Sequence, residues 1–134
     1  MQIIKLISFA CLWFLLNSCT TEQNKGYHDF IIYVDEIFLP DTISVNDTLS
    51  IKFNGLIGTD GCHTFKHFDV ASSGSTLNIT LWGTKPVINP GCNKIMVYLD
   101  GKEYKTKFSK PGLYKIIVTK SENHFITDSV LVKQ

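Results

Sequence analysis

Apolar and polar residues alternate with a period of two through most of the chain after Asp29. β-Branched and aromatic residues are frequent in these stretches, and short groups of Gly, Pro, Asn, Asp or Ser separate them. This combination predicts strands joined by turns, and no stretch has a convincing helical period. The expected strands are Phe30–Leu39, Thr48–Phe53, Thr64–Val70, the row Leu77, Ile79 and Leu81, Ile95–Leu99, Glu103–Phe108, Leu113–Thr119 and Phe125–Val132.

Some details of the pattern predict local geometry. Phe65, Phe68 and Val70 change parity within one strand, which indicates a β-bulge. Asn54-Gly55 is a turn signal, and Asp100-Gly101 predicts a tight hairpin between the strands on either side of it. About seven to eight short strands with such turns are typical of an all-β, antiparallel sandwich. A closed eight-stranded barrel is the alternative fold.

Two segments resemble bacterial immunoglobulin-like domains. The stretch Phe108–Val118 combines an apolar residue, a Pro-Gly turn and a tyrosine-bearing strand, as late strands of that family do. The stretch Thr42–Leu49 is similar to their approach to the second strand. The resemblance implies an immunoglobulin-like β-sandwich in which the hydroxyl of Tyr114 bonds back to the backbone, as in a tyrosine corner.

The first twenty residues resemble the signal of a bacterial lipoprotein of the Bacteroidetes type. Lys5 precedes the apolar run Leu6–Leu16, which has the length of a secretory signal and is too short to span a bilayer. The run ends in Leu16-Asn17-Ser18-Cys19, which resembles a lipobox. The resemblance implies that Cys19 carries lipid and becomes the first residue. An ordinary cleaved signal peptide and an uncleaved anchor are the alternatives.

These signals divide the chain into three parts. Residues 1–18 are the expected lipoprotein signal peptide, 19–28 the lipidated cysteine with a flexible polar tether, and 29–134 the β-domain. Thr20 follows the cysteine in place of Asp, which in enteric lipoproteins favours the outer membrane. We therefore expect attachment to the cell envelope through an N-terminal lipid anchor in the outer membrane, with the periplasmic and the surface face both open.

Charge and composition exclude some partners. Without residues 1–18 the chain holds 12 lysines and 12 acidic residues, so its net charge is close to zero. This balance argues against nucleic-acid binding. The absence of arginine also removes the usual bidentate clamp for phosphate groups.

The cysteines offer the clearest chemistry. Cys11 leaves with the signal peptide and Cys19 takes the lipid, so Cys62 and Cys92 remain to form a disulfide in an exported domain. A zinc site that adds His63 and His67 is the alternative, but two histidines four residues apart on a regular strand lie about 13 Å apart. We therefore expect both histidines to be exposed strand residues. We predict no metal and no cofactor.

No enzymatic constellation is readable. Pairing would consume the thiol that a Cys–His enzyme needs, and no serine lies in a Gly-x-Ser-x-Gly turn. We therefore expect a binding module rather than an enzyme, with an unknown protein or glycan partner. Its partner-facing residues are expected in the loops around Cys62 and Cys92, including His63 and His67, and on the strand face that bears Trp82. An inhibitor or enzyme with a cleft hidden from the sequence, and a purely structural envelope component, are the alternatives. A pocket that places either histidine against an acidic residue would favour the enzyme or inhibitor.

Overall fold

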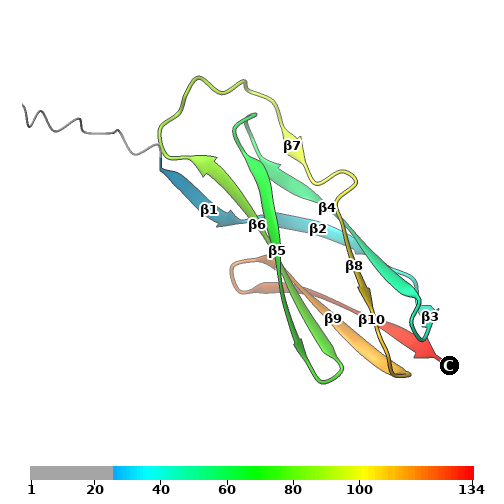
Figure 1. Cartoon of the computed structure of the whole chain (residues 1–134). Helices are drawn as coiled ribbons and strands as arrows, with labels where there is room; N and C mark the ends of the chain where they lie inside the picture. The colour runs from blue at the N-terminus through cyan, green and yellow to red at the C-terminus, as the bar shows by residue number, and fades with distance from the viewer. Residues whose placement is uncertain (1–25) are drawn as a thin grey trace, which may run out of the picture.

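The computed structural model describes residues 26–134, which form ten β-strands (Figure 1). The expected signal peptide and Cys19 lie outside the described residues. The first strand begins at Tyr27, two residues before the expected start of the domain. The strands are β1 (Tyr27–Ile31), β2 (Tyr33–Phe38), β3 (Thr42–Ser44), β4 (Thr48–Gly58), β5 (Thr64–Ser73), β6 (Thr76–Pro86), β7 (Val97–Tyr98), β8 (Glu103–Lys107), β9 (Gly112–Ser121) and β10 (His124–Lys133). Nowhere in 26–134 is there a helix with the length and hydropathy needed to cross a bilayer.

The strands form two sheets that enclose one core. Sheet A has six strands in the order β1-β6-β9-β10-β3, with β5 on the other edge of β6. Sheet B has four strands, with β2 on one edge of β4 and both β7 and β8 on the other. Sheet A curls around one side of the core like half a barrel, and sheet B covers the opposite side (Figure 1).

The expectation of a purely antiparallel fold is wrong for sheet A. Sheet B is antiparallel throughout, but β6 pairs in parallel with β9, and β10 pairs in parallel with β3. One edge of β6 is divided, with β1 beside Trp82–Pro86 and β9 beside Thr76–Ile79. Pairing between strands so distant in sequence leaves no mark in the local alternation, so the pattern predicted the strands but not their direction.

The predicted strand Phe30–Leu39 is two strands that belong to different sheets. β1 pairs with β6 in sheet A, and β2 pairs with β4 in sheet B. Ile32 lies between them, fully buried, and its N–H donates to the carbonyl oxygen of Leu81 at 2.9 Å. The chain therefore changes sheets without leaving an unpaired buried amide.

Two predicted turns do not connect paired strands in the way expected. β7 and β8 form no hairpin with each other, because both follow the same edge of β4. Asp100-Gly101 is a turn between β7 and β8. It is closed by the N–H of Lys102, which donates to the carbonyl oxygen of Leu99 at 2.8 Å. Asn54-Gly55 lies inside β4, where a Cβ on Gly55 would come within 2.2 Å of the Tyr33 carbonyl oxygen. That close approach explains a glycine within a strand.

The core follows the predicted inward rows. Leu49, Ile51 and Phe53 are buried, as are Leu77, Ile79 and Leu81, which confirms the alternation of both strands. No polar or charged residue of the described chain is buried. The other buried apolar residues are Ile32, Val34, Ile37, Ile57, Leu99, Ile116, Val118, Val130 and Val132.

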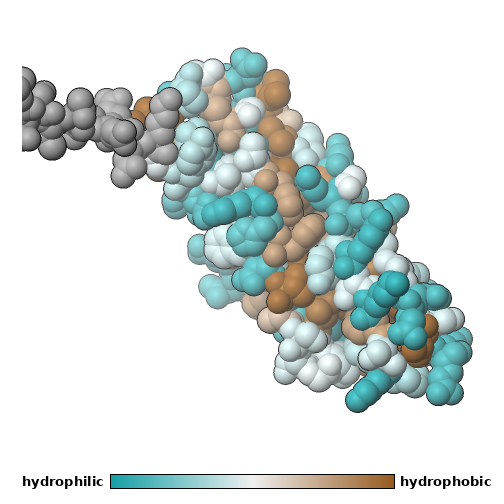
Figure 2. All heavy atoms as spheres, viewed as in Figure 1, coloured by the Kyte–Doolittle hydropathy of each residue, from teal (hydrophilic) through white to brown (hydrophobic). Residues whose placement is uncertain are grey.

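Aromatic rings close the flank between the two sheets. The predicted bulge in β5 is confirmed between Phe65 and His67. The Phe68 ring then packs against Phe53 of β4 and Tyr104 of β8, each with 5.5 Å between ring centroids. An apolar stripe follows this flank on the surface (Figure 2).

The expected hydrogen bond of Tyr114 is confirmed. Its hydroxyl donates to the carbonyl oxygen of Lys110 at 3.0 Å, and its ring stacks on Phe108 with 3.9 Å between centroids. The bond fixes the Pro111-Gly112 turn against the beginning of β9.

Candidate functional site

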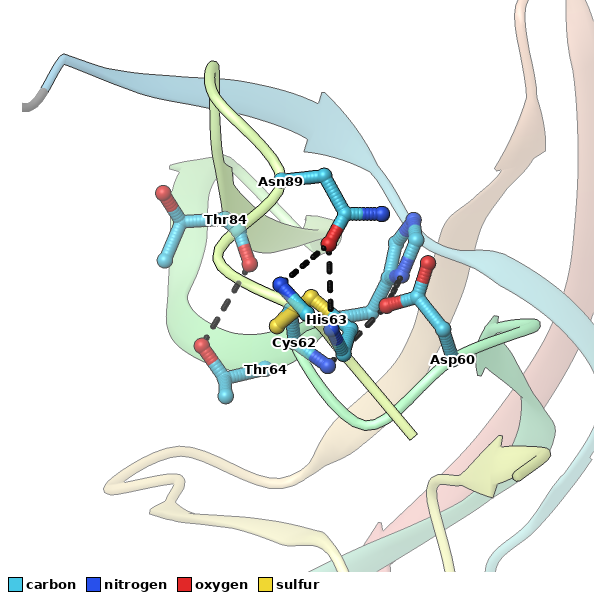
Figure 3. Close-up of polar contacts among 8 residues, drawn as sticks. Asp60, Cys62, His63, Thr64, Thr84 and Asn89 are labelled. Carbon is cyan, nitrogen blue, oxygen red and sulfur yellow. Dashed lines mark hydrogen bonds and ion pairs between the residues drawn. A yellow bond between two sulfur atoms is a disulfide. The ribbon is translucent and has the colours of Figure 1, made fainter. Parts of the chain in front are cut away.

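The predicted disulfide joins Cys62 and Cys92, whose Cα atoms are 5.5 Å apart. It lies at the end of the domain where β1 begins, since Gly26, Tyr27 and Cys62 line one depression. Figure 3 shows the bond between the two sulfur atoms. We call this region the disulfide end and define it by residues 26–27, 60–63 and 87–96. The bridge links the β4–β5 loop to the long connection between β6 and β7.

Asn89 organises the second of these loops. Its side-chain oxygen accepts hydrogen bonds from the backbone N–H groups of Gly91, at 2.8 Å, and Cys92, at 3.0 Å (Figure 3). This Asx-type turn is the arrangement that Asn before Pro-Gly favours. The turn and the disulfide together hold the loop against the sheets.

Asp60 and His63 form the most ordered polar pair at the disulfide end. Asp60 Oδ1 accepts from the His63 ring at 2.8 Å and from the Cys62 backbone N–H at 3.0 Å (Figure 3). An ionised carboxylate only accepts, so the ring nitrogen Nδ1 carries the proton. These hydrogen bonds hold the pKa of Asp60 below its ordinary value. The bond from His63 contributes most, and the bond from the Cys62 N–H comes next.

The Asp60 contacts predict a pH dependence of stability. The folded pKa of Asp60 is below the unfolded one, so its stabilisation is complete above about pH 4 and is lost as pH falls through the folded pKa. The difference in free energy of unfolding between the native protein and Asp60→Asn should therefore be largest near neutral pH and shrink in acid. Urea denaturation across this range measures it, and a difference independent of pH would contradict the assignment.

The position of His63 differs from the expected one. We expected an exposed strand residue, but His63 precedes β5 and only 14% of its side chain is exposed. Its ring meets the edge of Phe30 at a centroid distance of 5.4 Å. Two strand glycines make room for these rings: a Cβ on Gly58 would lie 2.1 Å from His63 Cγ, and one on Gly83 would lie 2.5 Å from Phe30 Cζ.

The disulfide end contains a pocket. Among the described residues, it also holds the group of side chains that most resembles a set of metal ligands. The pocket has a volume of about 340 Å³, and its lining includes Asp60, His63, His28 and Lys85. Ligand atoms of Asp60, Cys62 and Cys92 lie within 4.8 Å of one another. The two sulfurs are bonded to each other, so they are not thiolate ligands.

Trp82 occupies a second region, on the outer face of sheet A. It alternates with buried Leu81 and is partly exposed, as its parity indicated. A groove of about 680 Å³ lies here, between β1 and the turn that joins β9 to β10. We call it the Trp82 groove, and its lining residues are His28, Asp29, Phe30, Ile31, Tyr33, Trp82, Ser121, Glu122 and His124.

The groove follows from the divided edge of β6. β1 leaves sheet A after Ile31, which pairs with Trp82, whereas β9 pairs with β6 only as far as Ile79 and Val118. The sheet therefore opens between the two strands just where Trp82 lies. On the other side of β6, His67 is the exposed partner of Trp82.

Charged, polar and aromatic residues together line the groove. Lys66 forms an ion pair with Asp29, and this hydrogen bond is the main cause that lowers the pKa of the Asp29 carboxyl. Lys120 Nζ lies 5.4 Å from the centre of the Tyr33 ring. The groove thus combines ring faces with hydrogen-bonding groups of both signs.

The structure brings some of the predicted site residues together and separates others. Cys62, Cys92 and His63 meet at the disulfide end, whereas His67 and Trp82 share the outer face of sheet A. Sequence reasoning missed Asp60 and Phe30 as partners of His63. A signal for the crowding was present, because Gly58 and Gly83 interrupt otherwise regular strands.

No protein-family model, curated protein or solved structure matches this chain.

Proposed function

We propose that this protein is a lipid-anchored envelope lipoprotein that acts as a non-enzymatic binding module and contacts its ligand in the Trp82 groove. The lipobox-like stretch Leu16–Cys19 supports Cys19 as the site of the anchor. The observation that carries the binding site is the groove itself, whose lining combines Trp82 and Tyr33 with the acidic residues Asp29 and Glu122.

The geometry favours the outer face of sheet A over the disulfide loops as the partner surface. The N–H of Val87 donates to the carbonyl of Gly26 at 2.9 Å, so the disulfide end lies beside the point where the chain arrives from Cys19. A domain anchored through Cys19 keeps this end next to the membrane. The Trp82 groove, on the side of the domain, is left open to a ligand.

A carbohydrate is the ligand class that fits the groove best. Sugar rings offer apolar faces that stack on Trp and Tyr, and hydroxyl groups that bond to carboxylates, imidazoles and hydroxyls. The groove supplies both kinds of contact, with Trp82 and Tyr33 for stacking and Asp29, Ser121 and Glu122 for hydrogen bonding.

Binding to immobilised oligosaccharides tests this proposal. We expect the full-length protein to bind at least one member of a panel of envelope-type and host-type glycans. Trp82→Ala should weaken that binding at least about tenfold, the effect of losing a central aromatic contact. Tyr98→Ala is the matched control, because Tyr98 is an exposed aromatic residue of sheet B, 52% exposed, outside the groove. Equal binding by Trp82→Ala and native protein would refute the site.

One observation favours a second candidate function. His63 is hydrogen-bonded to Asp60 in a pocket, the arrangement of a general base oriented by a carboxylate. The pocket lining includes no serine or threonine, and its two cysteines are joined, so the base would have to activate water. Hydrolysis of p-nitrophenyl acetate that disappears in His63→Gln would support an esterase, and an inactive native protein would argue against it.

The immunoglobulin-like character of the domain is part of the same proposal. The Tyr114 bond to Lys110 and the two-sheet core support it. Such a sandwich presents loops and sheet faces on a rigid frame, as a binding module requires.

A further inference from the structure

The disulfide end exposes a group of large apolar side chains. Figure 2 shows apolar surface at this end of the domain, where β1 begins. The exposed fractions are 67% for Tyr27, 67% for Val87, 62% for Ile88, 56% for Ile95 and 56% for Met96. Tyr27 and Ile88 line one apolar depression together with Gly26, Cys62, Thr64, Pro86 and Pro90.

These side chains are exposed on a loop that the fold holds in place. Residues 87–96 are fixed through the disulfide at Cys92, through the Asn89 turn, and through the Gly61 N–H, which donates to the Asn93 carbonyl at 2.9 Å. A loop with such support presents its apolar residues at constant positions, so a partner surface meets them with little further ordering.

The chain arrives from Cys19 at this same end. Gly26 lies seven positions after Cys19, and a fully extended stretch of that length reaches at most about 25 Å. A lipid on Cys19 therefore keeps Gly26, and the loop bonded to it through Val87, within that distance of the bilayer.

The charge of the loop suits a membrane surface. No acidic residue occurs between Asp69 and Asp100, whereas Lys85 and Lys94 flank the apolar positions. Apolar side chains with lysines beside them are the usual composition of segments that lie in the headgroup region of a bilayer.

We propose that the disulfide end is a membrane-contact surface, on which Val87 and Ile88 enter the interfacial region of the bilayer beside Tyr27. The inference rests on the proposed lipid anchor at Cys19 and goes beyond it, because an anchor alone leaves the domain free to turn at the end of its tether. Contact through the loop fixes the orientation, so that the long axis of the domain stands away from the membrane.

Tryptophan reporters in the full-length protein test this contact. Ile88→Trp and Tyr27→Trp place a reporter at the disulfide end, and Leu113→Trp is the matched control, since Leu113 is also 62% exposed but lies at the start of β9, near the C-terminus. All three variants carry Trp82→Phe, and the other tryptophan of the sequence, Trp13, leaves with the signal peptide in the proposed processing. Each is purified from membranes and reconstituted into phosphatidylglycerol–phosphatidylcholine vesicles whose acyl chains are brominated or unmodified.

We expect brominated lipid to lower the emission of Ile88→Trp and Tyr27→Trp at least roughly twofold and to leave that of Leu113→Trp unchanged. Cosedimentation with the vesicles measures attachment through the anchor, independently of the contact that the loop makes. Cosedimentation without quenching at either reporter overturns the membrane contact and leaves the anchor in place. Loss of cosedimentation overturns the anchor and, with it, the contact. Self-association through the loop in place of quenching also overturns the proposal.

Discussion

Replacing Cys62 and Cys92 together by serine is expected to lower the free energy of unfolding by about 3–4 kcal/mol. The bridge closes a loop of 30 positions, so it removes much of the freedom of the unfolded chain. Within the folded domain it links the two loops of the disulfide end, and its loss also frees the connection from β6 to β7. Urea denaturation followed by near-ultraviolet circular dichroism measures the change.

Reduction provides the matched control for the cysteine pair. Native protein unfolded in the presence of a reducing agent should have the midpoint of the double serine variant, because both lack the cross-link. The variant itself should not respond to the reducing agent. An unchanged midpoint in the serine variant would remove the structural role of the disulfide.

Gly58→Ala is expected to lower the free energy of unfolding by about 1–3 kcal/mol, the usual cost of overpacking. The added Cβ would lie 2.1 Å from His63 Cγ, so the imidazole must move. His63 is held by Asp60 on one side and Phe30 on the other, and its displacement disturbs both contacts.

Gly61→Ala, three positions further along in the β4–β5 loop, is the control. A Cβ on Gly61 would meet the Ile95 side chain at 3.5 Å, which is an ordinary van der Waals contact. We expect this variant to stay within about 0.5 kcal/mol of the native protein, as most surface substitutions do. Equal destabilisation of the two variants would show that loop stiffness, rather than crowding at His63, is responsible.

The local pattern was sufficient for most strands and for the core. Alternation placed Leu49, Ile51 and Phe53 inside, turned Trp82 outward and indicated the bulge near Phe65 because each of these depends on neighbouring residues alone. The pairing of Cys62 with Cys92 followed from setting aside the cysteines assigned to the expected signal peptide and to the expected lipidation site.

What the sequence could not supply depends on contacts between distant segments. The change of sheet at Ile32 requires the Leu81 carbonyl, and the parallel pairing of β6 with β9 requires two strands far apart in the chain. The same holds for the site. Trp82 faces a groove only because β1 and β9 part beside it, and no periodicity in β6 records where its neighbours end.

The anchor is the premise shared by the proposed binding module and its membrane contact. A lipid on Cys19 would fix which end of the domain is near the bilayer, and so which surface is left for a ligand. The stretch Leu16–Cys19 predicts it from sequence alone.

Mass spectrometry of the N-terminal peptide of protein extracted from membranes tests this premise most directly. We predict a mature chain that begins at Cys19 and carries diacylglyceryl and acyl groups, and a Cys19→Ser variant that is released from the membrane fraction. An unmodified N-terminus, or a Cys19→Ser chain that stays with the membranes as the native protein does, would contradict the account.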